Sequence, residues 1–452
     1  MSLEDRNLFI SIWSFYTTVL PRSGKKFLKF HRCELEAKDI SDLLAAGLIE
    51  RAHAVNGTVI TFKVEEALKL RCRWVVFPKE INMEYPLDVK IPLEFIGDVV
   101  NNSKFSYAAT ADIVSCFHHF PLPVEARSYF VFFFDDVPYQ ITTIPTGGRH
   151  PPLIAQLATK TLALGPVQEM QHVTVYVDNV RFGGEDLPTV RNAMRWFLHR
   201  ASQCHFKVNV ELNGGTIYDF LGIHFEHLHN QDERLQVNLA SKFITKTQNT
   251  GLNPTPSLRE VVALFSRLMY GSVILGVRTH KFYVVFKFLR RRIGWPLDDD
   301  CRIWTTAATA IEDWRIEVLR NSPRCVVSAP QAYSVVFSDA SLTGWGAVAF
   351  RSDGRSLVVA GRWPPSLVND SINVLELRAV VNALDSLDTD FYVLLYVDNT
   401  TALYNVSKGR SRNFTANNLV GHLDTSRILG VFYVSSENNP ADGPSRYFAQ
   451  AP

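Results

Sequence analysis

Apolar and polar residues alternate most clearly between residues 172 and 184. Valine occupies every second position of 173–177, and the alternation resumes after Asp178 and Asn179. Two alternating runs around a two-residue Asp-Asn turn predict a β-hairpin. Taken alone, the two residues are best interpreted as turn formers. The same tetrapeptide, Tyr-Val-Asp-Asn, recurs at 396–399 in a different local pattern.

The first 230 residues combine short strands with short helices. Residues 34–52 predict an amphipathic helix that ends at Gly47. A Gly-rich loop at 144–152 leads into a helix that continues to about Leu164, and an earlier strand ends at Asp112. Other strands are expected at 58–64 and 72–77 as an antiparallel pair, at 128–134 and 137–141 around an Asp135-Asp136 hairpin turn, and near 206–210, with a helix at 187–204.

The rest of the chain changes pattern twice. Residues 257–293 have helical periodicity, and 323–330, which begins and ends with proline, is interpreted as a linker. The elements expected after it are strands at 333–338, 346–350 and 356–360, a helix at 374–387, a strand at 391–397, a helix from Thr400 and a strand at 431–434. This order is typical of a mixed α/β unit. We therefore expect a multi-domain α/β protein with domains at 1–230, 231–322 and 331–452.

Composition limits the class of protein. With 46% hydrophobic residues among 452, the chain is able to bury sizeable cores, which excludes a disordered protein. No apolar run approaches the ~18 residues of a membrane span, and the acidic residues near the start do not fit a signal or transit peptide. The six cysteines include no CxxC pair, which argues against a zinc knuckle and a disulfide framework. We expect an intracellular protein, cytoplasmic or nuclear, with no membrane partner.

The net charge of +2 does not indicate a polyanionic partner, but the distribution of charge does. Residues 261–297 contain no aspartate or glutamate and interleave aromatic with basic residues. The basic residues include Arg278, Lys281, Lys287, Arg290, Arg291 and Arg292. Such a segment suits contact with nucleic-acid phosphates and stacking on bases. A solvated face of an amphipathic helix explains it equally well.

Carboxylates at strand ends are the candidate chemistry. Asp112 ends one strand and Asp178 lies at a hairpin tip, so the pair is able to share a site if the two strands are neighbours. Transfer of a phosphoryl group to a 3′-hydroxyl uses two divalent ions held by such carboxylates, and magnesium prefers oxygen ligands. The C-terminal unit offers a second set on a strand, a helix, a strand end and the tail, namely Asp339, Glu376, Asp398 and Asp442. Any one of these is by default surface charge, whereas the four together indicate a second metal site.

These residues resemble the motifs of reverse transcriptases. Tyr-Val-Asp-Asn at 176–179 is similar to their Tyr-x-Asp-Asp box, and 111–122 resembles their first acidic motif, with an aromatic residue five positions after the Asp. The loop 144–152 resembles their Pro-Gln-Gly loop, Phe220-Leu-Gly222 their primer-grip region, and Arg73 with the following Ile81-Asn82 their fingers motif. The C-terminal unit resembles a ribonuclease H, including the ending Asn-Pro-Ala-Asp-x-x-Ser-Arg. The sequence Asp398-Asn-Thr-Thr-Ala-Leu403 is most similar to retrotransposons with tyrosine recombinases, the DIRS and Ngaro-like group with trypanosomatid relatives such as VIPER.

The resemblance implies a right-hand polymerase of fingers, palm and thumb followed by a ribonuclease H-like domain. It implies that Asp112 and Asp178 hold the polymerase metals and that Arg73 holds the triphosphate. It places Phe117 under the deoxyribose as a steric gate, and Gly147 and Asn179 beside the nucleotide. The second metal site is implied at Asp339, Glu376, Asp398 and Asp442, and the thumb at the basic segment. The expected ions are magnesium, with manganese as the alternative, two to each site. The expected partners are an RNA template, a DNA primer, the RNA–DNA hybrid and dNTPs.

The sequence departs from the family pattern in four ways. Asn179 replaces the second Asp of the box, which removes one negative charge, and we expect weakened rather than abolished polymerisation. Thr146 replaces the Gln of the loop. No lysine is clearly the triphosphate-binding fingers lysine, for which Lys63 and Lys69 are the candidates, and His422 is too far from Asp442 to form a retroviral-type His loop.

Two other functions therefore stay open. One is a reverse-transcriptase-like scaffold that binds RNA and has lost catalysis, which the changes at Asn179 and Thr146 favour. The other is a protein that has kept only the nuclease. The presence of all four nuclease acids, together with Asp112, Phe117 and Asp178, favours a chain that carries both activities.

Overall fold

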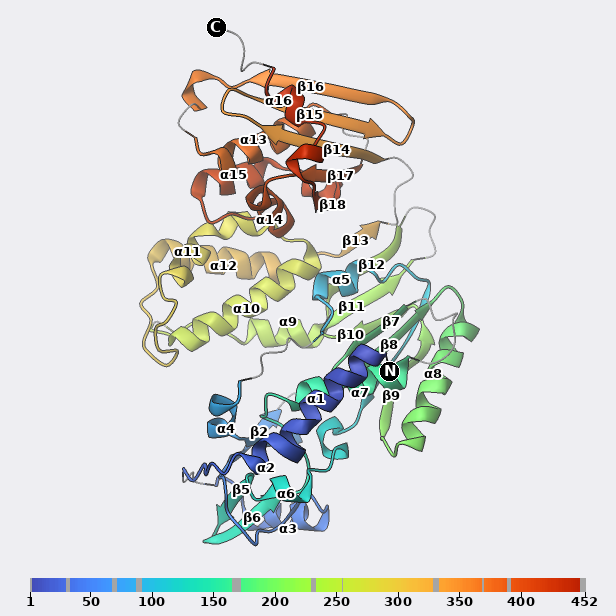
Figure 1. Cartoon of the computed structure of the whole chain (residues 1–452), viewed down its shortest axis with the longest axis vertical. Helices are drawn as coiled ribbons and strands as arrows, with labels where there is room; N and C mark the ends of the chain where they lie inside the picture. The colour runs from blue at the N-terminus through green and yellow to red at the C-terminus, as the bar shows by residue number, and fades with distance from the viewer. Residues whose placement is uncertain are drawn as a thin grey trace. The chain divides into compact units, whose positions relative to one another are not determined.

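The structure is a computed structural model that describes residues 2–29, 33–66, 71–86, 92–164, 172–228, 233–253, 255–327, 333–367, 370–387 and 392–447. The chain forms two compact units, Met1–Lys242 and Phe243–Pro452 (Figure 1). None of the described helices is both long enough and apolar enough to cross a membrane.

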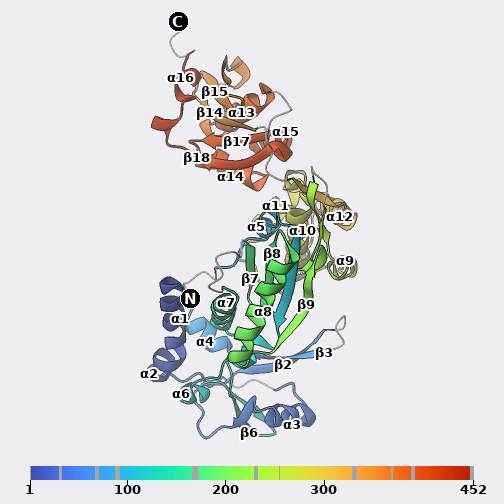
Figure 2. The ribbon, with the colours of Figure 1, turned by 90° about the vertical axis from the view of Figure 1, so that its right-hand side faces the viewer.

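An antiparallel four-stranded sheet is the centre of the N-terminal unit. Its strand order is β7-β8-β4-β9. The strands are β4 (Tyr107–Ile113), β7 (His172–Tyr176), β8 (Asn179–Gly184) and β9 (Val208–Gly215). Helices α7 (Pro151–Ala163) and α8 (Leu187–Gln203) pack on this sheet (Figure 2). The alternating pattern puts Ala109, Ala111, Val180 and Phe182 in the core, so burial of apolar side chains holds β4 beside β8.

Among the described residues of this unit, three smaller sets of strands lie outside the central sheet. Strands β1 (Ile49–Arg51), β6 (Val137–Ile141) and β5 (Val131–Phe134) form one sheet, β2 (Ile60–Glu66) and β3 (Arg71–Phe77) form a ribbon, and β10 (Ile217–Phe220), β11 (Ile223–His227) and β12 (Glu233–Leu239) are antiparallel neighbours. The antiparallel pair predicted at 58–64 and 72–77 is therefore confirmed as β2 and β3. Asp135 and Asp136 both have positive φ, 48° and 60°, as a two-residue hairpin turn requires, which confirms their interpretation as a turn.

The helices of this unit are short, apart from α1, α7 and α8. They are α1 (Leu3–Ser14), the π-helical turn Phe15–Val19, α2 (Leu20–Arg22), α3 (Ala37–Ala45), α4 (Lys79–Glu84), α5 (Ile96–Asn101), the 3₁₀ turn Cys116–His119 and α6 (Val124–Arg127). The helix predicted at 34–52 is wrong in its last part. Gly47 (φ 68°) follows the end of α3 as expected, but the next residues form β1, which pairs with β6.

Three other predicted boundaries also shift. The strand predicted at 128–134 begins only at Val131, because Tyr129 and Phe130 bond back to α6 in a turn. The strand predicted near 206–210 is β9, which runs on to Gly215. The predicted linker contains strand β13 (Arg324–Val327), and its last residues lie outside the described part of the chain.

The first part of the C-terminal unit is helical. It contains α9 (Ser241–Gln248), which starts at the unit boundary, α10 (Leu258–Leu275), the 3₁₀ turn Thr279–Phe282, α11 (Tyr283–Arg290) and α12 (Thr305–Leu319). The helical periodicity predicted for 257–293 is confirmed, with a break at Gly276, whose φ of 70° ends α10. Trp314 of α12 is fully buried, stacks on Phe282 and donates a hydrogen bond to Ser272 (2.7 Å), which ties the three segments together.

The second part of this unit is a five-stranded mixed sheet with helices. The strand order is β16-β15-β14-β17-β18, antiparallel across β14, β15 and β16 and parallel from β14 through β17 to β18. The elements are β14 (Tyr333–Ala340), β15 (Gly344–Arg351), β16 (Ser356–Arg362), α13 (Ile372–Asp385), β17 (Tyr392–Val397), α14 (Thr400–Lys408), α15 (Phe414–His422), β18 (Ile428–Tyr433) and α16 (Asp442–Ser445), with 3₁₀ turns at Pro365–Leu367, Thr425–Arg427 and Ser436–Asn438. The predicted order of strands, and the predicted helices α13 and α14, are confirmed, whereas α15 and α16 are additional helices.

Helix α15 is one of the elements that the pattern did not predict, together with α1, α9, α12, α16 and β12. Asn413 caps it by accepting a hydrogen bond from the Ala416 amide (3.0 Å), and Leu419 and Val420 turn toward the core. An Asn cap followed by an apolar pair was the available indication in the sequence. The mixed α/β multi-domain class expected from the sequence is confirmed.

Candidate active sites

The sheet of the N-terminal unit brings Asp112 beside the Asp178 turn. Asp112 on β4 lies opposite Asn179 on β8 and opposite Asn209 on β9. Asn209 donates a hydrogen bond to the Asp112 carboxylate (Nδ2–Oδ1, 2.9 Å), and the backbone amide of Ile113 donates to the Asp178 carbonyl (2.9 Å). The central condition for a shared site, that the two strands are neighbours, is therefore met. Asn209 was not predicted, although its place in the strand expected near 206–210 was a possible indication.

The turn itself differs from the predicted one. Tyr176 pairs with Asn179, so the two loop residues are Val177 and Asp178, and Asn179 already belongs to β8. Val177 has φ of 59°, a left-handed conformation that is costly for a β-branched residue. The buried side chain of Gln156 on α7 holds this turn from both sides: its Oε1 accepts from the Val177 amide (2.6 Å) and its Nε2 donates to the Val175 carbonyl (3.0 Å). The strained turn is thus fixed by one amide side chain.

Burial is the main cause of a raised pKa at Asp178, and the charge of Asp112 raises it further. Two neighbours act in the opposite direction. The charge of Arg73 lowers the pKa, and so does Asn179, whose Nδ2 donates to Asp178 Oδ1 (2.9 Å). A second aspartate at position 179 would repel the Asp178 carboxylate, whereas the asparagine present orients it. The centre accordingly contains two carboxylates, one cation and two amide side chains.

The Gly-rich loop is attached to β3. Thr146 accepts a hydrogen bond from the Val76 amide through its hydroxyl (3.0 Å), and the Gly147 amide donates to the Val76 carbonyl (2.8 Å). A Cβ atom at Gly147 would lie 2.8 Å from that carbonyl oxygen, so this position requires glycine because a strand passes close to it. Asn82 completes the attachment, since its amide donates to the Gly147 carbonyl and accepts from the Arg149 backbone.

The remaining residues that the resemblance implies for this site differ in how exposed they are and in what they contact. Arg73 lies exposed on β3, near enough to influence Asp178. Phe117, on the 3₁₀ turn after β4, is half-buried against the core. Lys63 forms an ion pair with Asp39 (Nζ–Oδ2, 3.0 Å), and Lys69 lies outside the described residues.

A second carboxylate centre lies in the C-terminal unit. Asp339 near the end of β14, Glu376 on α13 and Asp398 just after β17 each place a carboxylate oxygen within 4.8 Å of the others. Strands β14 and β17 are parallel neighbours, so their carboxyl ends meet at one edge of the sheet, and α13 packs on β14. Three of the four acids predicted for this site are therefore brought together.

The electrostatics of this centre suit a cation. Burial raises the pKa of Glu376 to about 9, with Asp339 and Asp398 adding to the shift. Burial also raises the pKa of Asp339 to about 6, with Asp398 and Asp442 adding to it. Asp398 Oδ1 is buried without a hydrogen-bond partner, while its Oδ2 accepts from Ser436 (2.7 Å). Clustered carboxylates with an unsatisfied oxygen fit the oxygen ligand set that magnesium and manganese prefer.

The C-terminal tail completes this centre. Asn439 donates to the Ser338 carbonyl on β14 (3.1 Å), and buried Ser445 donates to the Asp339 carboxylate (Oγ–Oδ2, 2.5 Å). Asp442 does not join the group of three and is bound by Arg446 (Nη2–Oδ1, 2.5 Å), although its charge reaches Asp339. The tail motif thus mainly attaches the C-terminal segment to β14 and to the Asp339 carboxylate. Ser445 was not predicted as a site residue, although it lies inside the motif that carried the resemblance.

The basic segment makes extensive contacts inside the C-terminal unit. Arg278 donates to the carbonyls of the last turn of α15 and of Leu423, Lys281 pairs with Glu317 (3.3 Å), and Arg290 reaches the Arg412 carbonyl (3.4 Å). Arg291 and Arg292 lie over aromatic rings, including that of Trp304, and Lys287 is exposed on α11. Much of this charge therefore organises the helices and contacts the part of the unit that contains the five-stranded sheet.

The fold is of the reverse-transcriptase kind. The foamy viral protease-reverse transcriptase in complex with dsDNA is one of the most similar solved structures, with a TM-score of 0.56 at 16% identity over 96% of this chain and 94% of that one. The same enzyme with an RNA/DNA hybrid gives 0.54 at 15% identity, over 96% and 61% of the two chains. A third foamy viral structure, the dRH form with dsDNA, gives 0.54 at 16% identity over 96% and 79%. No protein-family model and no curated protein matches the sequence.

Proposed function

We propose that this chain is an RNA-directed DNA polymerase whose C-terminal part is a ribonuclease H that cuts the RNA strand of RNA–DNA hybrids. The observation that carries the proposal is the cluster of Asp339, Glu376 and Asp398, three carboxylates that a divalent cation would stabilise together. The Asp112–Asp178 centre in the N-terminal unit supports the polymerase part of the proposal. The likeness to solved reverse transcriptases supports the fold in which both centres are placed.

Each centre has a defined set of candidate metal ligands. Asp112 and Asp178 would hold the ions of the polymerase site, and Asp339, Glu376, Asp398 and Asp442 those of the nuclease site. Divalent ions bound at such sites would activate the attacking oxygen and neutralise the negative charge on the phosphoryl group that is being transferred. Arg73, which already acts on Asp178, would bind the triphosphate of the incoming dNTP, with Phe117, Gly147 and Asn179 around the nucleotide. The template RNA, DNA primer and hybrid are the partners that this chemistry requires.

The sequence motifs alone support one finer assignment, a retrotransposon source related to the tyrosine-recombinase group. They also support domains at 1–230, 231–322 and 331–452. The basic segment, from Arg278 to Arg292, would act as a thumb that follows the duplex backbone, since Lys287 and parts of its arginines stay accessible.

Two activity assays on the full chain test the proposal. Asp178→Ala should abolish primer extension on an RNA template and leave hybrid cleavage intact, whereas Asp398→Ala should do the reverse. Each variant serves as the folding control for the other. A wild-type chain that extends no primer with magnesium or manganese would establish the nuclease-only alternative if it still cuts hybrid, and the RNA-binding scaffold if it does neither.

A further inference from the structure

The C-terminal tail carries two serines whose hydroxyl groups bind acids of the carboxylate cluster. Ser445, the last residue of α16, donates to Oδ2 of Asp339 (2.5 Å). Ser436, at the start of the 3₁₀ turn Ser436–Asn438, donates to Oδ2 of Asp398 (2.7 Å). The two acids lie near the ends of the neighbouring parallel strands β14 and β17. One short segment of chain therefore contacts both strand acids of the cluster.

Ser445 is held in place by contacts other than its bond to the carboxylate. It is fully buried, and its carbonyl accepts a hydrogen bond from the Ser341 hydroxyl (2.7 Å). A Cβ atom at Gly346 of β15 would lie 2.5 Å from the Ser445 amide nitrogen, so the two backbones are in direct contact. The Ser445 hydroxyl also lies 2.9 Å from the Asp442 carbonyl. A hydroxyl has one proton, and a charged carboxylate is the stronger acceptor, so this proton is directed at Asp339.

Asp398 shows what such a hydrogen bond does to a carboxylate. Its Oδ2 is bound by Ser436, whereas its Oδ1 is buried and has no hydrogen-bond partner among the described residues. The hydroxyl thus fixes the rotation of the carboxylate and leaves one defined oxygen free. A buried acceptor without a partner costs free energy, which a bound cation would recover. Between the two serines, Asn439 attaches the tail to β14 by donating to the Ser338 carbonyl (3.1 Å).

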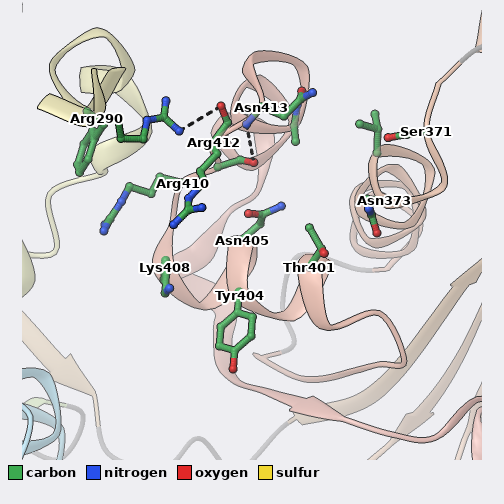
Figure 3. A pocket seen from close by; sticks show the side chains of 14 residues that line it. Arg290, Ser371, Asn373, Thr401, Tyr404, Asn405, Lys408, Arg410, Arg412 and Asn413 are labelled. Atoms are coloured by element: carbon green, nitrogen blue, oxygen red, sulfur yellow. Dashed lines mark hydrogen bonds between the residues drawn. The ribbon is translucent and has the colours of Figure 1, made fainter. Parts of the chain in front are cut away.

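The third acid is held without the tail. Glu376 lies on α13, and Asn373 of the same helix accepts a hydrogen bond from Asn399, the cap of α14 (Nδ2–Oδ1, 3.0 Å). Asn373 on α13 and Thr401 on α14 line one pocket (Figure 3). The two helices are therefore linked directly. The loss of a tail hydroxyl would act on the two strand acids and leave Glu376 in place.

We propose that Ser436 and Ser445 are positioning residues that set the affinity of the nuclease site for its divalent cations. This inference rests on the proposed function. Each serine binds one oxygen of an acid, so the other oxygen of that acid is oriented for a cation in advance. Hydrogen bonds from outside the ligand set typically contribute about 10–100-fold to metal affinity.

The test is the magnesium requirement of hybrid cleavage by the full chain. Ser436→Ala and Ser445→Ala should each raise the magnesium concentration for half-maximal cleavage about 10-fold. The cleavage rate at saturating magnesium should stay near that of wild type, and the magnesium requirement of primer extension should not change. Ser436 is exposed, so Ser436→Ala should fold even if Ser445→Ala does not. Ser436→Thr keeps the hydroxyl and should restore the wild-type requirement.

Ser341→Ala is the matched control. It removes a hydroxyl that holds the same tail through the Ser445 carbonyl, and the bonds of that hydroxyl are to backbone groups and to Thr343. Its melting temperature should fall about as far as that of Ser445→Ala, with an unchanged magnesium requirement. An equal rise of the requirement in Ser341→Ala would overturn the proposal, because the serines would then act only by attaching the tail. An unchanged requirement in both Ser436→Ala and Ser445→Ala would also overturn it.

Binding of Mn²⁺, followed by electron paramagnetic resonance, separates this proposal from the nuclease activity itself. The polymerase site is the same in every variant, so a difference between variants belongs to the nuclease cluster. Ser436→Ala and Ser445→Ala should bind Mn²⁺ about 10-fold more weakly there than wild type and Ser341→Ala. If the variants differ in this way but wild type cuts no hybrid, the nuclease is refuted and the positioning role is kept. If wild type cuts hybrid and all variants bind Mn²⁺ alike, the nuclease is kept and the positioning role is refuted.

Discussion

Glu376→Gln tests the electrostatics of the nuclease cluster most directly. Glutamine is close in shape to a protonated glutamate, so the change removes the ability to ionise with little change in packing. Burial raises the pKa of Glu376 in the folded chain to about 9, from an ordinary value of 4.5. Between these two pH values the folded chain keeps a proton that the unfolded chain releases, so raising the pH destabilises the fold, and the loss is complete above about pH 9.

The size of the effect follows from this shift. At about 1.4 kcal/mol per pH unit, the cost that accumulates between pH 4.5 and pH 8 is about 5 kcal/mol, which the coupled carboxylates of the cluster share. For a unit of this size each kcal/mol changes the melting temperature by about 2–4 °C. Calorimetry of the full chain in EDTA should therefore show the C-terminal unit of Glu376→Gln melting about 10–20 °C above wild type at pH 8, and near wild type at pH 5. Magnesium should stabilise the wild type more than the variant.

Asp385→Asn is the matched control, because it removes an exposed carboxylate from the far end of the same helix. Its effect should be small and equal at pH 5 and pH 8. A Glu376→Gln variant that is less stable than wild type at both pH values, or that gains equally at both, would refute the explanation by buried charge.

Three further predictions concern the N-terminal unit. Gln156→Leu leaves the Val177 amide and Val175 carbonyl without their partner, and primer extension should fall at least 10-fold while hybrid cleavage is kept; equal loss of both activities would contradict a local role. Asn179→Asp should lower the magnesium concentration for half-maximal extension, because it adds a carboxylate beside Asp178; an unchanged or raised requirement would mean that the site depends on the amide. Arg181→Met should cost about 2–4 kcal/mol in urea unfolding, because the buried guanidinium contacts the Val99 carbonyl, Thr174 and three aromatic rings; a loss below 1 kcal/mol would contradict this.

The sequence predicted most strands and the helices α3, α7, α8, α10, α11, α13 and α14, because alternating and helical patterns report which face of an element is buried. It also predicted that Asp339, Glu376 and Asp398 lie together. The carboxyl ends of the parallel strands β14 and β17 meet at one edge of the sheet, and α13 packs on β14 beside that edge. The sequence did not predict Gln156, Asn209 or α15. Their roles depend on partners that are distant in sequence, and no local pattern marks an amide that reaches another strand's backbone.

The repeated tetrapeptide Tyr-Val-Asp-Asn shows that the role of a motif depends on the secondary structure around it. At 176–179 the turn is Val177-Asp178, and Asn179 begins a strand and donates to Asp178. At 396–399 the asparagine caps α14 by accepting from Ala402 (3.0 Å) and donates to Asn373. An aspartate at 399 would keep the cap but lose that donor, whereas an aspartate at 179 would turn an attractive contact with Asp178 into a repulsive one. The same substitution would therefore change the charge beside Asp178 in the first setting and remove the hydrogen bond to Asn373 in the second.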